Sequence, residues 1–76
     1  MVAKAFVMIE TAVGKTKEVV AALKRQEGVQ SVNTVTGPYD IIAIIERETL
    51  SDIGDLVTSK IHTVNGVSRT VTCLAI

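Results

Sequence analysis

The side chains best suited to bind a small molecule lie in the segment Gly37-Pro38-Tyr39-Asp40, which contains the only tyrosine of the chain. A free amino acid requires an acceptor for its ammonium group and donors for its carboxylate. Asp40 and the backbone N–H groups of a loop could supply both. A tight turn explains Gly37, which permits positive φ, and Pro38, whose own φ is fixed. It does not explain Tyr39 and Asp40, so the segment is a candidate binding loop.

Other polar or reactive residues carry weaker signals. Thr70 and Thr72 alternate with Val71, so their side chains share one strand face, a pattern equally typical of ordinary β-branched strand residues. Cys73, the only cysteine, has no accompanying base, which favours packing as a small hydrophobic residue over nucleophilic catalysis. His62, the only histidine, lies late in a predicted helix, where an imidazolium suits the helix dipole. We therefore predict no disulfide, no structural zinc, no catalytic residue and no cofactor.

Charge and length exclude several classes of protein. The 76 residues include eight Lys or Arg and eight Asp or Glu, so the formal net charge is zero. Nucleic-acid binding normally requires a basic excess, and Phe6 and Tyr39 alone offer no platform for stacking bases, so we expect no direct DNA or RNA binding. No segment approaches the roughly 20 apolar residues of a membrane span. One unpaired cysteine without an export signal indicates the cytoplasm.

The elements that position these residues are indicated by an internal repeat. Shifting the sequence by half of its 76 residues brings similar residues together at corresponding positions. The matched pairs are Glu10-Thr11 with Glu48-Thr49, Val19 with Val57, Leu23 with Ile61, and Gly28-Val29 with Gly66-Val67. The chain therefore consists of two β-α-β halves.

Hydrophobic pattern and helix-end signals give the bounds of these elements. We predict strands over Val2–Glu10, Val29–Thr36, Ile41–Arg47 and Val67–Ile76, a first helix from Gly14 to Glu27, and a second helix between Thr49 and Gly66. Thr49 and Asp52 form a capping pattern, and the apolar stripe of the second helix is Leu50, Ile53, Leu56, Val57, Ile61 and Val64. The turn at Gly37 to Asp40 joins two strand-like runs and predicts a hairpin.

The predicted order βαββαβ is that of an α+β, ferredoxin-like sandwich. Its four-stranded antiparallel sheet has the first and third strands at the centre and both helices on one face. The two central strands, Ala5–Ile9 and Ile41–Ile45, are apolar on both faces, although the helices can cover only one. We therefore expect a second, identical sheet to pack against the open face across a twofold axis. A sheet that merely exposes some aliphatic side chains is the simpler alternative.

Three segments of the chain resemble a known family. They are AFVMIET, EGVQSVNTVTGPYDIIAIIE and VNGVSRTVTCLAI, and they look like the effector-binding domain of the Lrp/AsnC transcription regulators, also called the regulation of amino-acid metabolism (RAM) domain. The most specific parts are Val35–Asp40 and Gly66–Thr72. The resemblance covers essentially the whole chain, 1–76. Because the first strand begins at Val2, we predict a single ligand-binding domain without the family's helix-turn-helix domain.

The resemblance implies a sheet-to-sheet dimer (a dimeric α+β barrel), a ring of dimers, and an amino-acid effector bound between dimers near the hairpin loop. It implies that Gly37, Tyr39, Asp40, Thr70 and Thr72 bind the effector. It also matches Thr36, Leu50 and Cys73 to pocket-lining positions. We therefore predict a non-enzymatic oligomeric module that senses an amino acid or a similar metabolite. Full-length Lrp/AsnC regulators are candidate partners, because they would share the same dimer and ring surfaces.

Two other functions are compatible with the same βαββαβ fold. One is a small dimeric α+β barrel enzyme, such as a monooxygenase or isomerase, which would need polar or aromatic groups between sheet and helices. The sequence places Val, Leu and Ile there instead, so this alternative is disfavoured. The other is a purely structural oligomerisation module without a ligand. Saturable amino-acid binding without chemistry would distinguish the leading hypothesis from both.

Overall fold

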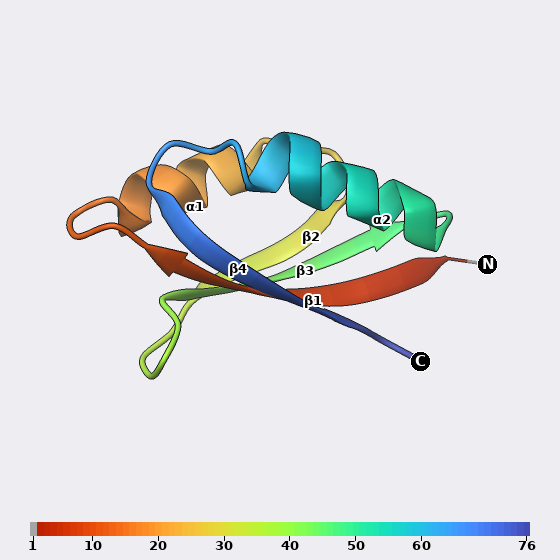
Figure 1. The fold of residues 1–76 in the computed structure, drawn as a ribbon, viewed down its shortest axis with the longest axis horizontal. Coiled ribbons are helices and arrows are strands. Elements are labelled where there is room, and N and C mark those ends of the chain that lie inside the picture. Colours follow the sequence, from red (N-terminus) through yellow and green to blue (C-terminus); the bar gives the residue numbers. More distant parts are fainter. Residues whose placement is uncertain (1) are drawn as a thin grey trace.

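Strands and helices alternate along the chain in the predicted order β-α-β-β-α-β (Figure 1). The computed structural model describes residues 2–76. The strands are β1 (Ala3–Thr11), β2 (Val29–Thr34), β3 (Ile41–Arg47) and β4 (Val67–Leu74). The helices are α1 (Thr16–Lys24) and α2 (Leu50–Leu56), and α2 continues directly into a π-helical segment, η1 (Val57–Ile61). The predicted α+β ferredoxin-like fold is confirmed.

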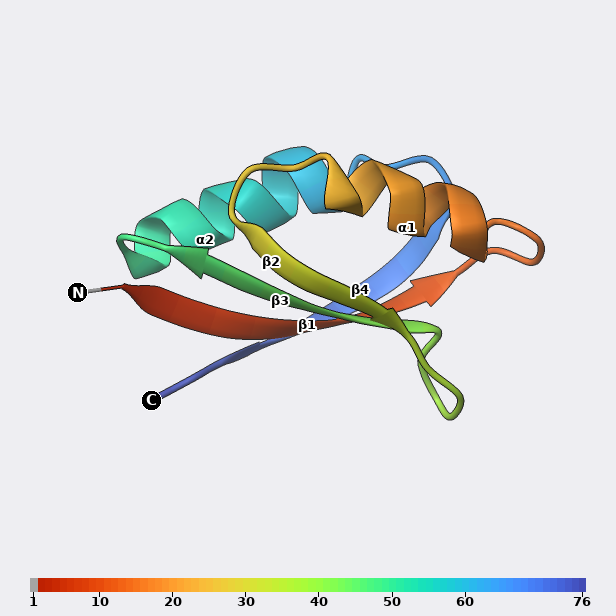
Figure 2. The same cartoon turned by 180° about the vertical axis from the view of Figure 1, so that it is seen from behind.

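The four strands form one sheet in the order β2-β3-β1-β4, and all neighbours are antiparallel. The first and third strands are therefore central, as predicted. Both helices lie over one face of the sheet, as the two opposite views show (Figures 1 and 2). Between the two layers lies a core made entirely of aliphatic side chains: Ala5, Val7, Ile9, Val19, Leu23, Ile41, Ala43, Ile45, Ile53, Leu56, Val57 and Ile61.

The internal repeat corresponds to real structural equivalence. Its matched helical residues, Val19, Leu23, Val57 and Ile61, are all buried between the helices and the sheet. Its matched glycines, Gly28 and Gly66, both follow a helix and adopt positive φ, at 95° and 102°. Glycine accommodates this left-handed conformation without the steric penalty that a Cβ imposes, which explains why both halves end their helices in the same way.

Several element ends differ from the prediction. The observed bounds are Ala3–Thr11 for Val2–Glu10, Val29–Thr34 for Val29–Thr36, Val67–Leu74 for Val67–Ile76, and Thr16–Lys24 for a helix from Gly14 to Glu27. The first helix starts later because Gly14 has a φ of 78°, which is incompatible with a right-handed helix. The second strand ends earlier, at Thr34, and the loop that follows contains Gly37, whose φ is 134°.

The second helix begins at its predicted cap but buries less of its predicted stripe. The hydroxyl oxygen of Thr49 accepts a hydrogen bond from the N–H of Asp52 at 3.0 Å, which confirms the cap. Leu50, the first residue of that stripe, is 58% exposed and is not part of the core. Leu50 lies in the first helical turn near the edge strand β4, where the neighbouring Leu74 is itself exposed.

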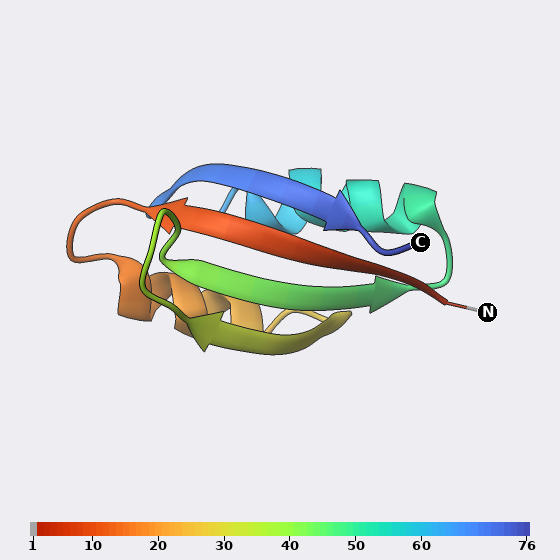
Figure 3. The ribbon, with the colours of Figure 1, turned by 90° about the horizontal axis from the view of Figure 1, so that it is seen from below.

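We call the face of the sheet opposite the helices, which is turned to the viewer in Figure 3, the open face. The alternation of buried residues in β1 and β3, with the strand register, places its apolar members: Phe6, Met8, Ile42, Ile44, Val71 and Cys73. Phe6 remains 37% exposed and Val71 36% exposed. The predicted apolarity on both faces of the central strands is therefore present, and within residues 2–76 no second layer covers the open face.

Candidate ligand-binding site

The loop between β2 and β3 is closed by backbone hydrogen bonds and tied to the central strand β1. The N–H of Val35 donates to the carbonyl of Asp40 at 2.9 Å, and the N–H of Asp40 donates to the carbonyl of Ile9 at 2.9 Å. Thr36 and Gly37 are exposed, whereas Tyr39 and Asp40 are half-buried. The loop thus holds two of its predicted binding residues against the end of the sheet.

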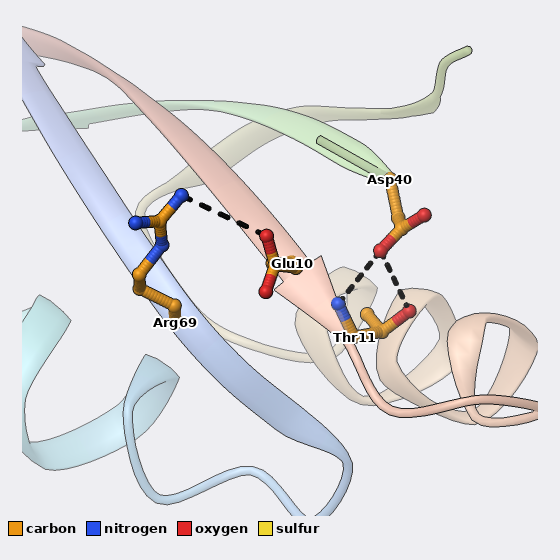
Figure 4. A network of polar contacts seen from close by, with 4 residues as sticks. All are labelled: Glu10, Thr11, Asp40 and Arg69. Atoms are coloured by element: carbon orange, nitrogen blue, oxygen red, sulfur yellow. Dashed lines mark hydrogen bonds and ion pairs between the residues drawn. The ribbon is translucent and has the colours of Figure 1, made fainter. Parts of the chain in front are cut away.

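Asp40 anchors this loop through its side chain as well (Figure 4). One carboxylate oxygen, Oδ2, accepts hydrogen bonds from the backbone N–H of Thr11 at 2.8 Å and from the Thr11 hydroxyl at 3.3 Å. The Thr11 hydroxyl also contacts the hydroxyl of Thr16, in the first turn of α1, at 2.8 Å. Asp40 therefore has a structural role in addition to the binding role predicted for it.

Tyr39 lies beside a second polar group at the same end of the sheet. The guanidinium of Arg69, on β4, lies 5.7 Å from the centre of the Tyr39 ring. Arg69 also pairs with Glu10 on β1, with 3.7 Å between Nη2 and Oε2. A cation over an aromatic face is attracted by the ring quadrupole, so Arg69 holds Tyr39 against the sheet. Two consecutive loop residues thus contact two different polar groups.

Thr70 and Thr72 lie on the helix-facing side of β4, opposite Ile9 and Val7. This confirms that they share one face. The Thr70 hydroxyl forms a hydrogen bond with Nε2 of His62, which follows η1. Thr72 instead lines a groove of about 260 Å³ between β4 and the second helix. The groove is mainly apolar, and its other lining residues are Leu50, Ile53, Gly54, Val57, Thr58 and Leu74.

The structure therefore separates the predicted site residues into four places, the last of which, that of Cys73, is the open face. Thr36, Gly37, Tyr39 and Asp40 lie in the loop. Thr70 is level with Ile9, near the loop end of the sheet, whereas Thr72 and Leu50 line the groove farther along β4.

Cys73 lies on the open face, opposite Phe6, and its side chain is exposed. The predicted packing of Cys73 as a small hydrophobic residue is wrong for the single chain, because β4 is an edge strand with no second layer over it. Cys73 also faces away from Thr72, its neighbour along the strand, because successive strand residues point to opposite faces.

A hollow larger than the groove that Thr72 lines lies elsewhere on the described surface. A groove of about 460 Å³ runs between the end of α1 and the second helix. Its lining mixes both charge signs: Gln26, Glu27, Arg47, Asp52, Asp55, Leu56, Ser59 and Lys60. Among residues 2–76, no three His, Cys, Asp or Glu side chains gather into a group able to hold a metal ion. None of the helices formed by these residues has the length and hydropathy to cross a membrane.

Comparison with known proteins identifies the family. A family model described as the Lrp/AsnC ligand binding domain matches residues 4–76. The chain belongs to the Lrp/AsnC family. A Pyrococcus furiosus protein described as an uncharacterized HTH-type transcriptional regulator, PF0250, is 32% identical over 59 residues. That match covers 78% of this chain and 39% of the relative, so the chain spans well under half of the regulator's length.

Solved structures show the same domain fold. The crystal structure of FFRP-DM1 superposes with a TM-score of 0.93 at 35% identity, covering 97% of this chain and 99% of that one. TTHA0845 from Thermus thermophilus also superposes with a TM-score of 0.93, at 34% identity, and the match covers 97% of this chain and 92% of that one. The regulator NMB0573 from Neisseria meningitidis, solved in complex with L-Met, superposes with a TM-score of 0.88 at 16% identity. The match covers 97% of this chain and 49% of that one. This last likeness establishes a shared fold only.

Four polar residues of this Lrp/AsnC domain were not singled out from the sequence as site residues. They are Thr11, Thr16, His62 in its contact with Thr70, and Arg69. Glu10 ends a predicted strand and Thr11 directly follows it, and the sequence offers no further signal that the Thr11 hydroxyl meets a residue 29 positions away. Arg69 had a weak signal, because it precedes Thr70, which the resemblance implies to be an effector-binding residue.

Proposed function

We propose that this Lrp/AsnC domain is a non-enzymatic, oligomeric module that senses an amino acid or a similar small metabolite. The observation that carries the proposal is the placement of Asp40. Its half-buried carboxylate lies in a loop anchored to the central strand, within a chain that matches a ligand-binding domain over residues 4–76. An ammonium group would gain a charge-assisted hydrogen bond there. Backbone N–H groups of the exposed segment Thr36–Gly37 would face the carboxylate.

The ligand class is supported by the relatives. NMB0573 and the Mycobacterium tuberculosis protein Rv3291c, described as a feast or famine regulatory protein, were both solved with L-methionine. In this chain, Tyr39 and Thr70 would complete the contacts around the ligand near the loop. Thr72 and Leu50 would line the adjoining groove, and Cys73 would reach a ligand only across an assembly interface.

A role in regulation follows from the same relatives, which include HTH-type transcriptional regulators. We propose that the domain, residues 1–76, assembles sheet to sheet through the open face and further into a ring of dimers. Occupancy would then pass to full-length Lrp/AsnC regulators that share these surfaces.

An enzymatic function finds less support. A dimeric α+β barrel enzyme requires polar or aromatic groups between the sheet and the helices. Within residues 2–76 the buried side chains are all aliphatic, with no polar or charged residue among them. A reacting group in this buried core would therefore have no polar partner.

The test is a thermal-shift screen over the twenty L-amino acids, followed by calorimetry on the amino acid that raises the melting temperature most. Asp40→Asn should weaken its binding by about 2–5 kcal/mol, because the ammonium loses its charged partner. The asparagine keeps an oxygen that can accept from the Thr11 N–H, so the loop should stay in place. Thr70→Val and Thr72→Val should each cost about 0.5–1.5 kcal/mol.

The matched control is Asp55→Asn, which removes an exposed carboxylate from α2. Its affinity should equal that of the wild type. If no amino acid shifts the melting temperature, the proposed sensing function is wrong. If Asp40→Asn binds as tightly as the wild type, a ligand binds elsewhere and Gly37 to Asp40 is only a turn.

A further inference from the structure

The two oxygens of the Asp40 carboxylate differ in their hydrogen bonding. Oδ2 accepts two hydrogen bonds from Thr11, at 2.8 Å from its N–H and 3.3 Å from its hydroxyl. Oδ1 points away from Thr11 (Figure 4), and no hydrogen bond among residues 2–76 reaches it. One oxygen is therefore fixed to the protein, while the other is available to a ligand.

Fixing one oxygen of a carboxylate restricts the other, because the group is planar and rotates as a unit. An ammonium arriving at Oδ1 would meet an acceptor whose rotation is already restricted, so little side-chain entropy would be lost on binding. We infer that Thr11 is a positioning residue for the ammonium group of the amino-acid ligand. This inference rests on the proposed function and adds to it a residue that need not touch the ligand.

The orientation of the Thr11 hydroxyl is itself determined by its neighbours. Its oxygen lies 2.8 Å from the hydroxyl of Thr16. A threonine hydroxyl has one proton, so when Thr11 donates to Asp40, the Thr16 hydroxyl must donate to Thr11. The adjacent loop is also anchored, because the N–H of Ala12 donates to the carbonyl of Gly66 at 2.8 Å. The hydrogen bonds that link Thr16 of α1, through Thr11, to Asp40 are thus all formed before any ligand arrives.

A double-mutant cycle between Thr11 and Asp40 tests the inference. Thr11→Val keeps the backbone N–H and the side-chain shape but removes the hydroxyl. In the full 76-residue chain, this substitution should weaken the binding of the amino acid with the highest affinity in the twenty-member screen. Calorimetry should show a Kd raised by about 2- to 10-fold. Thr11→Ser restores a hydroxyl and should recover most of that loss. In an Asp40→Asn background, Thr11→Val should change the affinity by less than about twofold, because the charged contact is already absent.

The control is Thr58→Val, which removes a comparable side-chain hydrogen bond, from the Thr58 hydroxyl to the carbonyl of Gly54 at 2.9 Å. It should leave the affinity for the amino acid unchanged. Melting curves will show whether the variants are equally stable. Equal losses from Thr11→Val in both backgrounds, or an equal loss from Thr58→Val, would refute the positioning role while leaving amino-acid sensing intact. A wild type that binds none of the twenty amino acids would overturn both proposals.

Discussion

Two adjacent isoleucines on β3 should respond in opposite ways to the same substitution. Ile41 is fully buried under the helices, whereas Ile42 is half-buried on the open face. Neighbouring strand residues point to opposite faces, so an aspartate at each position tests one face at a time. We expect Ile41→Asp to unfold the chain and Ile42→Asp to give a folded monomer.

The magnitudes follow from burial. A domain of this size has a free energy of unfolding of about 4–11 kcal/mol. Truncating a fully buried isoleucine costs about 2–5 kcal/mol, and leaving an unpaired carboxylate in the core adds several more. Together these exceed the available stability. In a sheet-to-sheet dimer, Ile42→Asp would bury two unpaired carboxylates at about 3–5 kcal/mol each, which raises the dimer Kd by about 10⁴- to 10⁷-fold.

Sedimentation equilibrium measures the dimer, and far-ultraviolet circular dichroism measures the fold. The matched control is Val13→Asp, because Val13 is 101% exposed in the loop before α1 and should tolerate the charge without effect. An Ile42→Asp protein that dimerises as tightly as the wild type would show that the open face is not the interface. A wild type that sediments as a monomer at micromolar concentration would refute the dimer itself.

Two further predictions concern two glycines with positive φ, Gly66 and Gly14, and nucleic acid. At Gly66, where φ is 102°, an added Cβ would lie 2.8 Å from the Lys15 Cβ and 3.1 Å from a Val19 methyl group. At Gly14, where φ is 78°, an added Cβ would meet nothing within 4 Å. Gly66→Ala should therefore destabilise the chain by about 1–3 kcal/mol more than Gly14→Ala in urea unfolding, and equal losses would contradict the crowding argument. The chain alone should give no sequence-specific DNA footprint at physiological salt, because its formal net charge is zero, and a footprint without a partner protein would contradict this.

The fold could be predicted because its signals are local and repeated. Gly28 and Gly66 end the two helices, and the apolar runs around Ala5–Ile9 and Ile41–Ile45 mark the central strands. Each of these signals involves residues close together in sequence. The boundary errors came from backbone conformation, since the positive φ of Gly14 delays the first helix in a way that residue type alone does not specify.

The site was less predictable because its contacts join distant parts of the chain. The sequence identified Asp40 as an acceptor, but the donor at Thr11 is 29 residues away. Whether Thr70 faces a ligand or His62 depends on where the turn before β4 places the imidazole. Register, and not residue type, decides that Cys73 lies on the opposite face from Thr72.

The two half-buried loop residues link the proposed ligand site to the proposed dimer face. Asp40 contacts Thr11, whose hydroxyl reaches the first turn of α1. Tyr39, its immediate neighbour, contacts Arg69, which pairs with Glu10 at the border of the open face. A ligand that binds Asp40 would therefore lie next to Tyr39 and the Arg69 guanidinium that contacts its ring. Such coupling requires that a ligand favour one arrangement of these contacts over another, because only differential affinity shifts an equilibrium. The Tyr39–Arg69 contact is thus one route by which ligand binding could alter assembly.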